Sequence, residues 1–166
     1  MKKGFFYETA IGRVGIAELE GAVTNVFFGN TVRPEAFEAE ETALLNSAAR
    51  QLTEYFAGRR KTFDLPLLPQ GTDFERAVWT ALLTVPYGQT RTYGQIAAQI
   101  GKPAASRAVG RANGRNPISL LIPCHRVIGA GGKAVGYAGG VELKLRLLAG
   151  LMTRTSYLMT RIASLV

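Results

Sequence analysis

The stretch TYGQIAAQIGKPAASRAVGRANGRN (residues 92–116) contains the pattern that decides the fold of this chain. Residues 93–100 predict a short helix, Gly101-Lys102-Pro103 predicts a tight turn, and residues 104–113 predict a second helix. Two helices joined by a glycine-containing turn form a helix-turn-helix, a motif that many DNA-binding proteins use.

The second predicted helix combines small residues with regularly spaced arginines. Alanine and glycine fill half of its positions, while Arg107, Arg111 and Arg115 recur every four residues and therefore lie on one face. Small side chains let a helix backbone approach a narrow surface such as the DNA minor groove, where arginines meet phosphates. The other interpretation is an alanine-rich helix that packs tightly on a neighbouring helix. Both interpretations can hold on opposite faces.

The charge of the chain is unevenly distributed. Residues 1–75 contain 8 Lys/Arg and 11 Asp/Glu, a net charge of −3, whereas residues 76–166 contain 12 Lys/Arg and a single acid, Glu142, a net charge of +11. A basic surface can serve solubility alone, but such an asymmetry within one chain favours a polyanionic partner for the second part.

The N-terminal part has the pattern of a small α/β domain. Residues 4–30 alternate apolar and polar side chains between glycines, as strands of an antiparallel sheet do. Residues 36–57 carry apolar side chains at helical spacing, with Gly58 as a stop signal. Residues 61–71 include two prolines and predict an extended linker. We therefore expect an N-terminal α/β domain over residues 1–70.

A mostly helical C-terminal domain is expected over residues 71–166. It begins with TDFERAVWTALLTV (residues 72–85), where Thr72 is a helix N-cap and Glu75, three residues later, completes a capping box. The turn Pro86-Tyr87-Gly88 ends this helix.

Composition limits the compartment and the cofactors. One cysteine among 166 residues excludes an internal disulfide and a multi-cysteine zinc site, so a reducing compartment is expected. No apolar run approaches the ~20 residues of a membrane span, and the start of the chain lacks the apolar core of a signal peptide. We expect a soluble, cytoplasmic protein that does not bind membranes and is monomeric without DNA.

The run IPCHRVIG (residues 122–129) contains both the single cysteine and the single histidine of the chain. A free cysteine is often a small buried apolar residue. Against that interpretation, His125 can act as a base or hydrogen-bond partner of Cys124, and Arg126 favours the nucleophilic thiolate. Pro123 restricts the preceding residue to extended geometry. In an extended segment, neighbouring side chains point to opposite faces, so contact between thiol and imidazole requires a bend or a bridging water.

The run NPISLLIPCHRVIG (residues 116–129), followed by GYAGG (residues 136–140), resembles the active-site signature of the O6-alkylguanine-DNA alkyltransferases, also called methylated-DNA–protein-cysteine methyltransferases. The resemblance spans residues 71–148 and is weaker in the N-terminal part. It implies an RNase H-like N-terminal domain and a helix-turn-helix in the minor groove of double-stranded DNA. It further implies a flipped target base and the irreversible, single-turnover transfer of the alkyl group from O6-alkylguanine, or from O4-alkylthymine, to a cysteine, with no metal or organic cofactor.

The resemblance also assigns roles to residues of this chain. Cys124 matches the alkyl acceptor and His125 matches its partner, which acts through a water. Arg107 matches the arginine that fills the space of the flipped base, and Tyr93 matches the tyrosine that crowds the target phosphate. The pocket residues implied are Asn116, Tyr137, Ala138, Gly139 and Gly140, and further DNA contacts are implied for Gly94, Lys102, Arg111, Arg115 and Ala130.

One position departs from the family pattern K-x-x-L-L-x-x-E. Lys144, Leu147 and Leu148 match it, but Leu151 stands where the family has the glutamate that orients the histidine. Without a carboxylate the imidazole is expected to be less basic and less fixed. Two alternatives therefore stay open: a protein that binds alkylated DNA with weak or no transfer, and a helix-turn-helix regulator.

Overall fold

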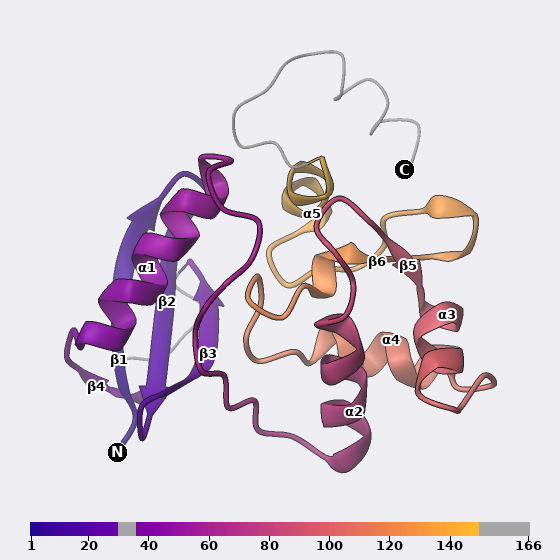
Figure 1. Cartoon of the computed structure of the whole chain (residues 1–166), viewed down its shortest axis with the longest axis horizontal. Coiled ribbons are helices and arrows are strands. Elements are labelled where there is room, and N and C mark those ends of the chain that lie inside the picture. Colours follow the sequence, from indigo (N-terminus) through magenta and orange to yellow (C-terminus); the bar gives the residue numbers. More distant parts are fainter. Residues whose placement is uncertain (30–35, 150–166) are drawn as a thin grey trace. The chain divides into compact units, whose positions relative to one another are not determined.

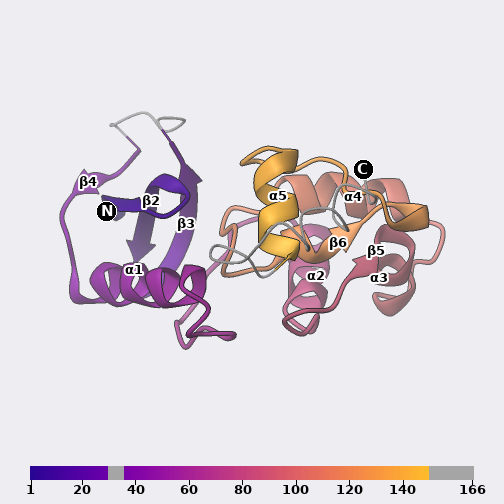
Figure 2. The ribbon, with the colours of Figure 1, turned by 90° about the horizontal axis from the view of Figure 1, so that it is seen from above.

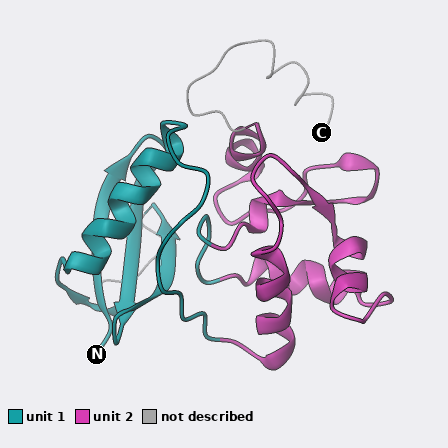
Figure 3. Cartoon of the chain, viewed as in Figure 1, with its two compact units in different colours: residues 1–70, 117–121 teal, residues 71–116, 122–166 magenta. Residues whose placement is uncertain are grey.

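The computed structural model describes residues 1–29 and 36–149, which form two compact units (Figure 3). Unit 1 comprises residues 1–70 and 117–121, and unit 2 comprises residues 71–116 and the chain from residue 122 onward. Within the described residues, no helix is both long and apolar enough to cross a membrane.

Unit 1 is built on a four-stranded sheet with the order β3-β2-β1-β4 (Figure 1). The strands β1 (Lys3–Thr9), β2 (Gly12–Leu19) and β3 (Ala22–Phe28) run antiparallel and are joined by tight turns. This arrangement confirms the antiparallel sheet predicted from the alternating pattern of residues 4–30.

One helix, α1 (Ala43–Phe56), covers a face of this sheet (Figure 2). It buries Leu45, Leu52 and Phe56, and the hydroxyl of Thr42 accepts a hydrogen bond from the Leu45 N–H at 3.2 Å, which caps the helix. The prediction of a helix from residue 36 is wrong in its first part, because β4 (Glu38–Ala39) pairs with β1 in parallel before the cap.

Residues 117–121 belong to unit 1, although the sequence pattern assigned them to the C-terminal domain. The N–H of Val26 donates to the carbonyl of Pro117 at 2.9 Å, and Val26 and Ile118 form a parallel bridge at the edge of β3. Ile118 and Leu120 are fully buried. An apolar run thus joins the core of the first unit and returns to the second at Ile122, two residues before Cys124.

Unit 2 is mostly helical, as predicted. Its longer elements are α2 (Asp73–Leu82), α3 (Tyr93–Gln99), α4 (Ser106–Gly114) and α5 (Val141–Leu148). Two short strands, β5 (Arg91–Thr92) and β6 (Val127–Ile128), pair in parallel, and two single helical turns are η2 (Cys124–Arg126) and η3 (Ala130–Gly132). Helix α4 starts two residues later than predicted, because the Ala105 N–H closes a turn onto the Lys102 carbonyl at 2.9 Å.

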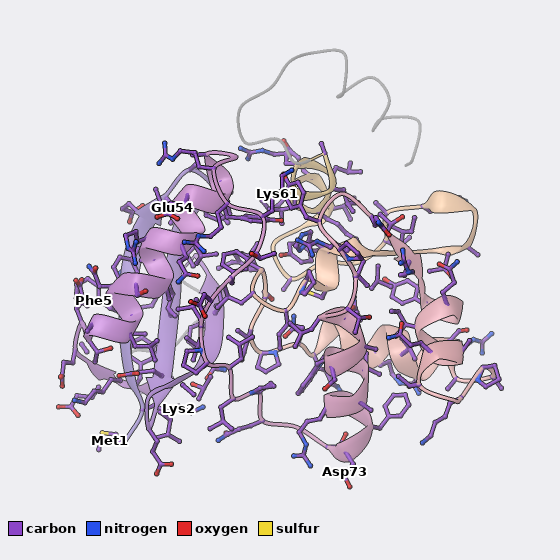
Figure 4. All side chains as sticks on the ribbon, viewed as in Figure 1. Met1, Lys2, Phe5, Glu54, Lys61 and Asp73 are labelled. Carbon is purple, nitrogen blue, oxygen red and sulfur yellow. The ribbon has the colours of Figure 1, made fainter. Side chains whose placement is uncertain are left out.

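The predicted capping box begins α2. The Thr72 hydroxyl accepts from the Glu75 N–H at 3.2 Å, and the Glu75 carboxylate accepts from the Thr72 N–H at 2.9 Å. Asp73 lies at the same end of the helix (Figure 4), where its negative charge is favourable. Further along, the buried Trp79 indole N–H donates to the Ala112 carbonyl at 2.8 Å and so fixes α2 to α4.

Replacing the cap tests the stability of unit 2. Thr72→Ala removes one partner of the capping box and is expected to lower the free energy of unfolding by about 1 kcal/mol. The matched control is Thr80→Ala, an exposed position on the same helix, with an expected change within about 0.5 kcal/mol. Urea unfolding followed by the fluorescence of Trp79, the only tryptophan, measures both. Equal midpoints for the two variants would contradict a stabilising cap.

Candidate active site and nucleic-acid interface

The single thiol lies in a helical turn and not in an extended segment. Residues Cys124–Arg126 form η2, with the Arg126 N–H donating to the Pro123 carbonyl at 3.0 Å. The extended segment, in which the two side chains would point to opposite faces, is therefore not present here, because Pro123, at φ −80° and ψ 62°, turns the chain. Successive side chains of such a turn point about 120° apart. Thiol and imidazole thus leave the turn in different directions but on neighbouring sides.

Two asparagines at the end of α4 hold the backbone of this turn. The Asn116 side-chain amide donates to the Ile122 carbonyl at 2.8 Å, and the Asn113 side-chain amide donates to the Cys124 carbonyl at 3.3 Å. Both asparagines are buried, so these bonds are shielded from competing water. Asn116 was predicted to brace this loop. Asn113 was not predicted, and a polar residue among alanines at a helix end is its only sequence signal.

The active-site side chains are almost completely buried. Cys124 is 3% exposed and His125 is 1% exposed. Burial, together with the positive charges of Arg126 and Lys144, lowers the pKa of His125 to about 3. The imidazole is therefore neutral at physiological pH, able to accept a proton or to donate one hydrogen bond.

The predicted pocket loop lies against this histidine. The rings of His125 and Tyr137 meet edge to face with centroids 6.4 Å apart. The loop continues through Ala138 and Gly139 to Gly140, whose N–H donates to the Tyr137 carbonyl at 3.0 Å. Gly140 has φ 94°, a conformation that favours glycine, and it forms the N-cap of α5. The structure thus brings four of the predicted pocket residues, Tyr137 to Gly140, to the N-terminal end of α5, while Asn116 lies just beyond α4.

A basic side chain lies beneath the loop. Lys144 on α5 is fully buried, and its ammonium donates to the carbonyls of Val135 and Gly136 at 2.9 and 3.3 Å. The phenol of Tyr93 donates to the same Val135 carbonyl at 3.2 Å. In the sequence, Lys144 is identified only by its match to the family pattern. The burial of its side chain was not predicted, because no local sequence pattern indicates a buried lysine.

Four of the predicted DNA contacts line one surface hollow of about 370 Å³ on unit 2. They are Tyr93, Gly94, Arg107 and Ala130, and the remaining lining residues are Thr92, Ser106 and Gly110. Burial raises the pKa of Tyr93, and negative charge on Cys124 raises it further.

The other predicted contacts lie outside the hollow. Arg111 and Lys102 are exposed, and the Lys102 ammonium lies 5.3 Å from the centre of the Phe74 ring. Arg115 is the C-cap residue of α4 and forms an ion pair with Glu75 at 3.3 Å on the surface. Leu151, the position of the family glutamate, lies outside the described residues. Among residues 1–29 and 36–149, no group of three or more potential metal ligands occurs.

Comparison with known proteins identifies the family. Residues 73–150 match the DNA-binding domain of 6-O-methylguanine DNA methyltransferase, and residues 3–69 match its ribonuclease-like domain. The chain belongs to this family.

Individual members of the 6-O-methylguanine DNA methyltransferase family are similar over most of the chain. A methylated-DNA–protein-cysteine methyltransferase of Methanosarcina acetivorans is 49% identical over 146 residues, which covers 86% of this chain and 93% of the relative. A methyltransferase of the same name from Mycobacterium tuberculosis is 48% identical, with 85% of this chain and 87% of the relative covered. A crystal structure of Mycobacterium tuberculosis OGT in complex with DNA matches with a TM-score of 0.82 and 45% identity, over 88% of this chain and 90% of that one.

The pKa of His125 predicts acid sensitivity. Its value of about 3 in the folded protein lies below the ordinary 6.5. Between these two pH values the imidazole is protonated in the unfolded chain and neutral in the folded one. The stabilising contribution is complete above pH 6.5 and is lost as the pH falls toward 3. By pH 5 the loss is about 2 kcal/mol.

Since His125 is the only histidine, His125→Gln isolates this effect. The free energy of unfolding of the variant is expected to fall by about 2 kcal/mol less than that of the wild type between pH 7 and pH 5. Urea unfolding at several pH values measures the difference. Parallel pH profiles for the two proteins would mean that the folded state accepts the proton.

Proposed function

We propose that this protein repairs alkylated DNA by direct reversal, with Cys124 as the acceptor of the alkyl group. The observation that carries the proposal is the place of the only thiol. It lies on a turn fixed by two buried amides and next to a neutral imidazole, in the same unit as the hollow lined by Tyr93 and Arg107. Its relatives are named as methyltransferases that act on methylated DNA through a protein cysteine.

The proposed chemistry is one displacement at carbon. The Cys124 thiolate attacks the alkyl carbon on O6 of guanine, a C–S bond forms, and the C–O6 bond breaks with its electron pair going to the purine. The thiol proton passes through a water to His125, whose neutral imidazole relays it to solvent from its other nitrogen, and the purine anion takes up one proton from solvent, so that the protons balance. The thioether that results is stable, so each molecule acts once. The same displacement applies to O4-alkylthymine.

Reaching the buried thiol requires that the base leave the DNA stack. Extrusion of a nucleotide costs a few kcal/mol and less for a base that pairs badly, which favours lesions. Arg107 lines the hollow and is exposed, as a side chain that replaces the extruded base must be. Tyr93, on the opposite helix of the pair, is suited to crowd the phosphate of the target. The proposed pocket for the guanine consists of Tyr137, the N–H of Ala138, and the loop backbone at Gly139 and Gly140.

The glycines of α4 support minor-groove binding of double-stranded DNA. A Cβ added at Gly110 would make an ordinary contact with the Tyr93 ring at 3.8 Å, and one added at Gly114 would meet no described atom within 4 Å. Packing among the described residues therefore does not require these glycines. A slim helix with exposed Arg107 and Arg111, and with Lys102, Gly94 and Ala130 beside it, suits a narrow anionic groove.

Intact mass spectrometry tests the function. Incubation with duplex DNA that carries O6-methylguanine is expected to add one methyl group per protein molecule, at Cys124. Cys124→Ser is expected to bind the same DNA without gaining mass, since a hydroxyl is a far weaker nucleophile at neutral pH. Binding by the wild type without a mass change would instead favour a lesion-binding protein, which the leucine at position 151 makes a specific alternative. Methyl gain by Cys124→Ser would exclude Cys124 as the acceptor.

Arg107 is expected to serve extrusion of the base more than general affinity. Arg107→Ala should slow repair of duplex DNA by about tenfold or more, because a loss of ~1.4 kcal/mol from the extruded state suffices for this. The reaction with free O6-benzylguanine, which needs no extrusion, should change much less.

Arg111→Ala is the matched control, since Arg111 is exposed on the same helix but lies outside the hollow. It should weaken DNA binding and its salt dependence without a selective loss of duplex repair. Equal slowing of Arg107→Ala on both substrates would count against its role in extrusion.

A further inference from the structure

A fully buried lysine lies on α5, the helix that packs against the turn of Cys124. Lys144 has no exposed surface, and its ammonium donates to two backbone carbonyls, those of Val135 and Gly136. Two neutral acceptors compensate only part of the hydration that a buried ammonium loses. Burial accordingly lowers the pKa of Lys144 to about 8.

The described acids of unit 2 are engaged elsewhere or are exposed. Asp73 pairs with Arg76, Glu75 pairs with Arg115, and Glu142 is exposed in the first turn of α5. The one negative charge that raises the pKa of Lys144 is that of the Cys124 thiolate. Helix α5 packs against η2, the turn that carries this cysteine.

Among the neighbouring groups, His125 and Tyr93 are uncharged at neutral pH, whereas the Arg126 guanidinium is charged but contacts a backbone carbonyl and an aromatic ring. His125 is neutral because of its burial. The Arg126 guanidinium donates to the Val85 carbonyl at 2.8 Å and lies 5.7 Å from the centre of the Tyr87 ring. From α3, Tyr93 presents a phenol that donates to the Val135 carbonyl. The charged residues of α2, which also packs on the turn, are confined to its first turn.

We propose that the buried ammonium of Lys144 is the positive charge that holds Cys124 in its thiolate form, and that the carbonyls of Val135 and Gly136 fix this ammonium in place. Lys144 is thus a positioning residue for the alkyl transfer, and its role rests on the proposed function. The attraction between two opposite charges is stronger in a buried site than in bulk water. It also explains how a protein with leucine at position 151 can activate its thiol although its histidine is a weak base.

The single cysteine permits a direct test without DNA. The ultraviolet absorbance of the thiolate, titrated below the pH near 10 at which tyrosines ionise, reports Cys124 alone, with Cys124→Ser as the baseline. In Lys144→Gln the midpoint is expected to rise by about one pH unit or more, because the charge is lost while an amide donor remains for the carbonyls. Arg146→Gln removes an equal charge from the same helix and should leave the midpoint unchanged. Equal midpoints for Lys144→Gln and the wild type would overturn the proposal.

A reciprocal measurement covers the case in which Lys144→Gln does not fold. Coupling between two sites is mutual, so removal of the thiolate must lower the pKa of Lys144. Carbon NMR of proteins with labelled lysine side chains follows this in the wild type and in Cys124→Ser. A lower midpoint in the variant supports the pairing, and an identical one contradicts it.

Failure of the repair function is a separate result. The repair function fails if the wild-type protein gains no methyl group from lesion-containing DNA, whatever the midpoint of the thiolate titration. If transfer occurs and the midpoint does not respond to Lys144→Gln, the role of Lys144 is excluded and the repair function stands.

Discussion

The reactive centre depends on two buried side-chain amides that hold one backbone turn. Asn113 and Asn116 end α4 and donate to the carbonyls of Cys124 and Ile122. Through these bonds the helix that we propose to meet DNA and the turn that carries the thiol become one rigid piece. Trp79 extends this piece to α2 by donating to the Ala112 carbonyl. A displacement at carbon demands alignment of sulfur and substrate, and such a scaffold supplies it before the substrate arrives.

The electrostatics of the site differ from those of a nucleophile–histidine–acid set. In such a set a carboxylate raises the basicity of the imidazole. Here Arg126 and Lys144 act in the opposite direction and reinforce the effect of burial, so the pKa of His125 falls to about 3. A neutral imidazole still relays a proton through its two nitrogens, but it offers no charge to stabilise a thiolate. The positive charge that stabilises a thiolate must therefore come from a lysine or an arginine. Lys144 lies on the helix that packs on the turn.

Local sequence patterns predicted the structural features that depend on contacts between residues close in the sequence. The alternation of residues 4–30 gave an antiparallel sheet, and the spacing of Thr72 and Glu75 gave a capping box, because both depend on neighbours in the sequence. Features that depend on distant contacts were missed. Residues 117–121 joined unit 1 through β3, and Lys144 became buried under a loop that starts nine residues earlier. A bend at Cys124 was one of two possibilities left open, and the sequence could not decide between them, because Pro123 favours an extended predecessor and leaves its own ψ free.

A leucine at position 151 can be reconciled with a retained nucleophile on chemical grounds. A carboxylate acts on the thiol only through the histidine and the water that link them, whereas the ammonium that we propose as its partner acts on the thiolate charge directly. With a pKa of about 8, Lys144 is mostly protonated at neutral pH and gives up its proton in the range where an ordinary thiol would ionise. The two titrations therefore belong to the pair and not to either residue. Alkylation converts the Cys124 thiolate into a neutral thioether, which leaves the buried ammonium with backbone carbonyls alone. The protonation state of Lys144 therefore depends on whether Cys124 has been alkylated.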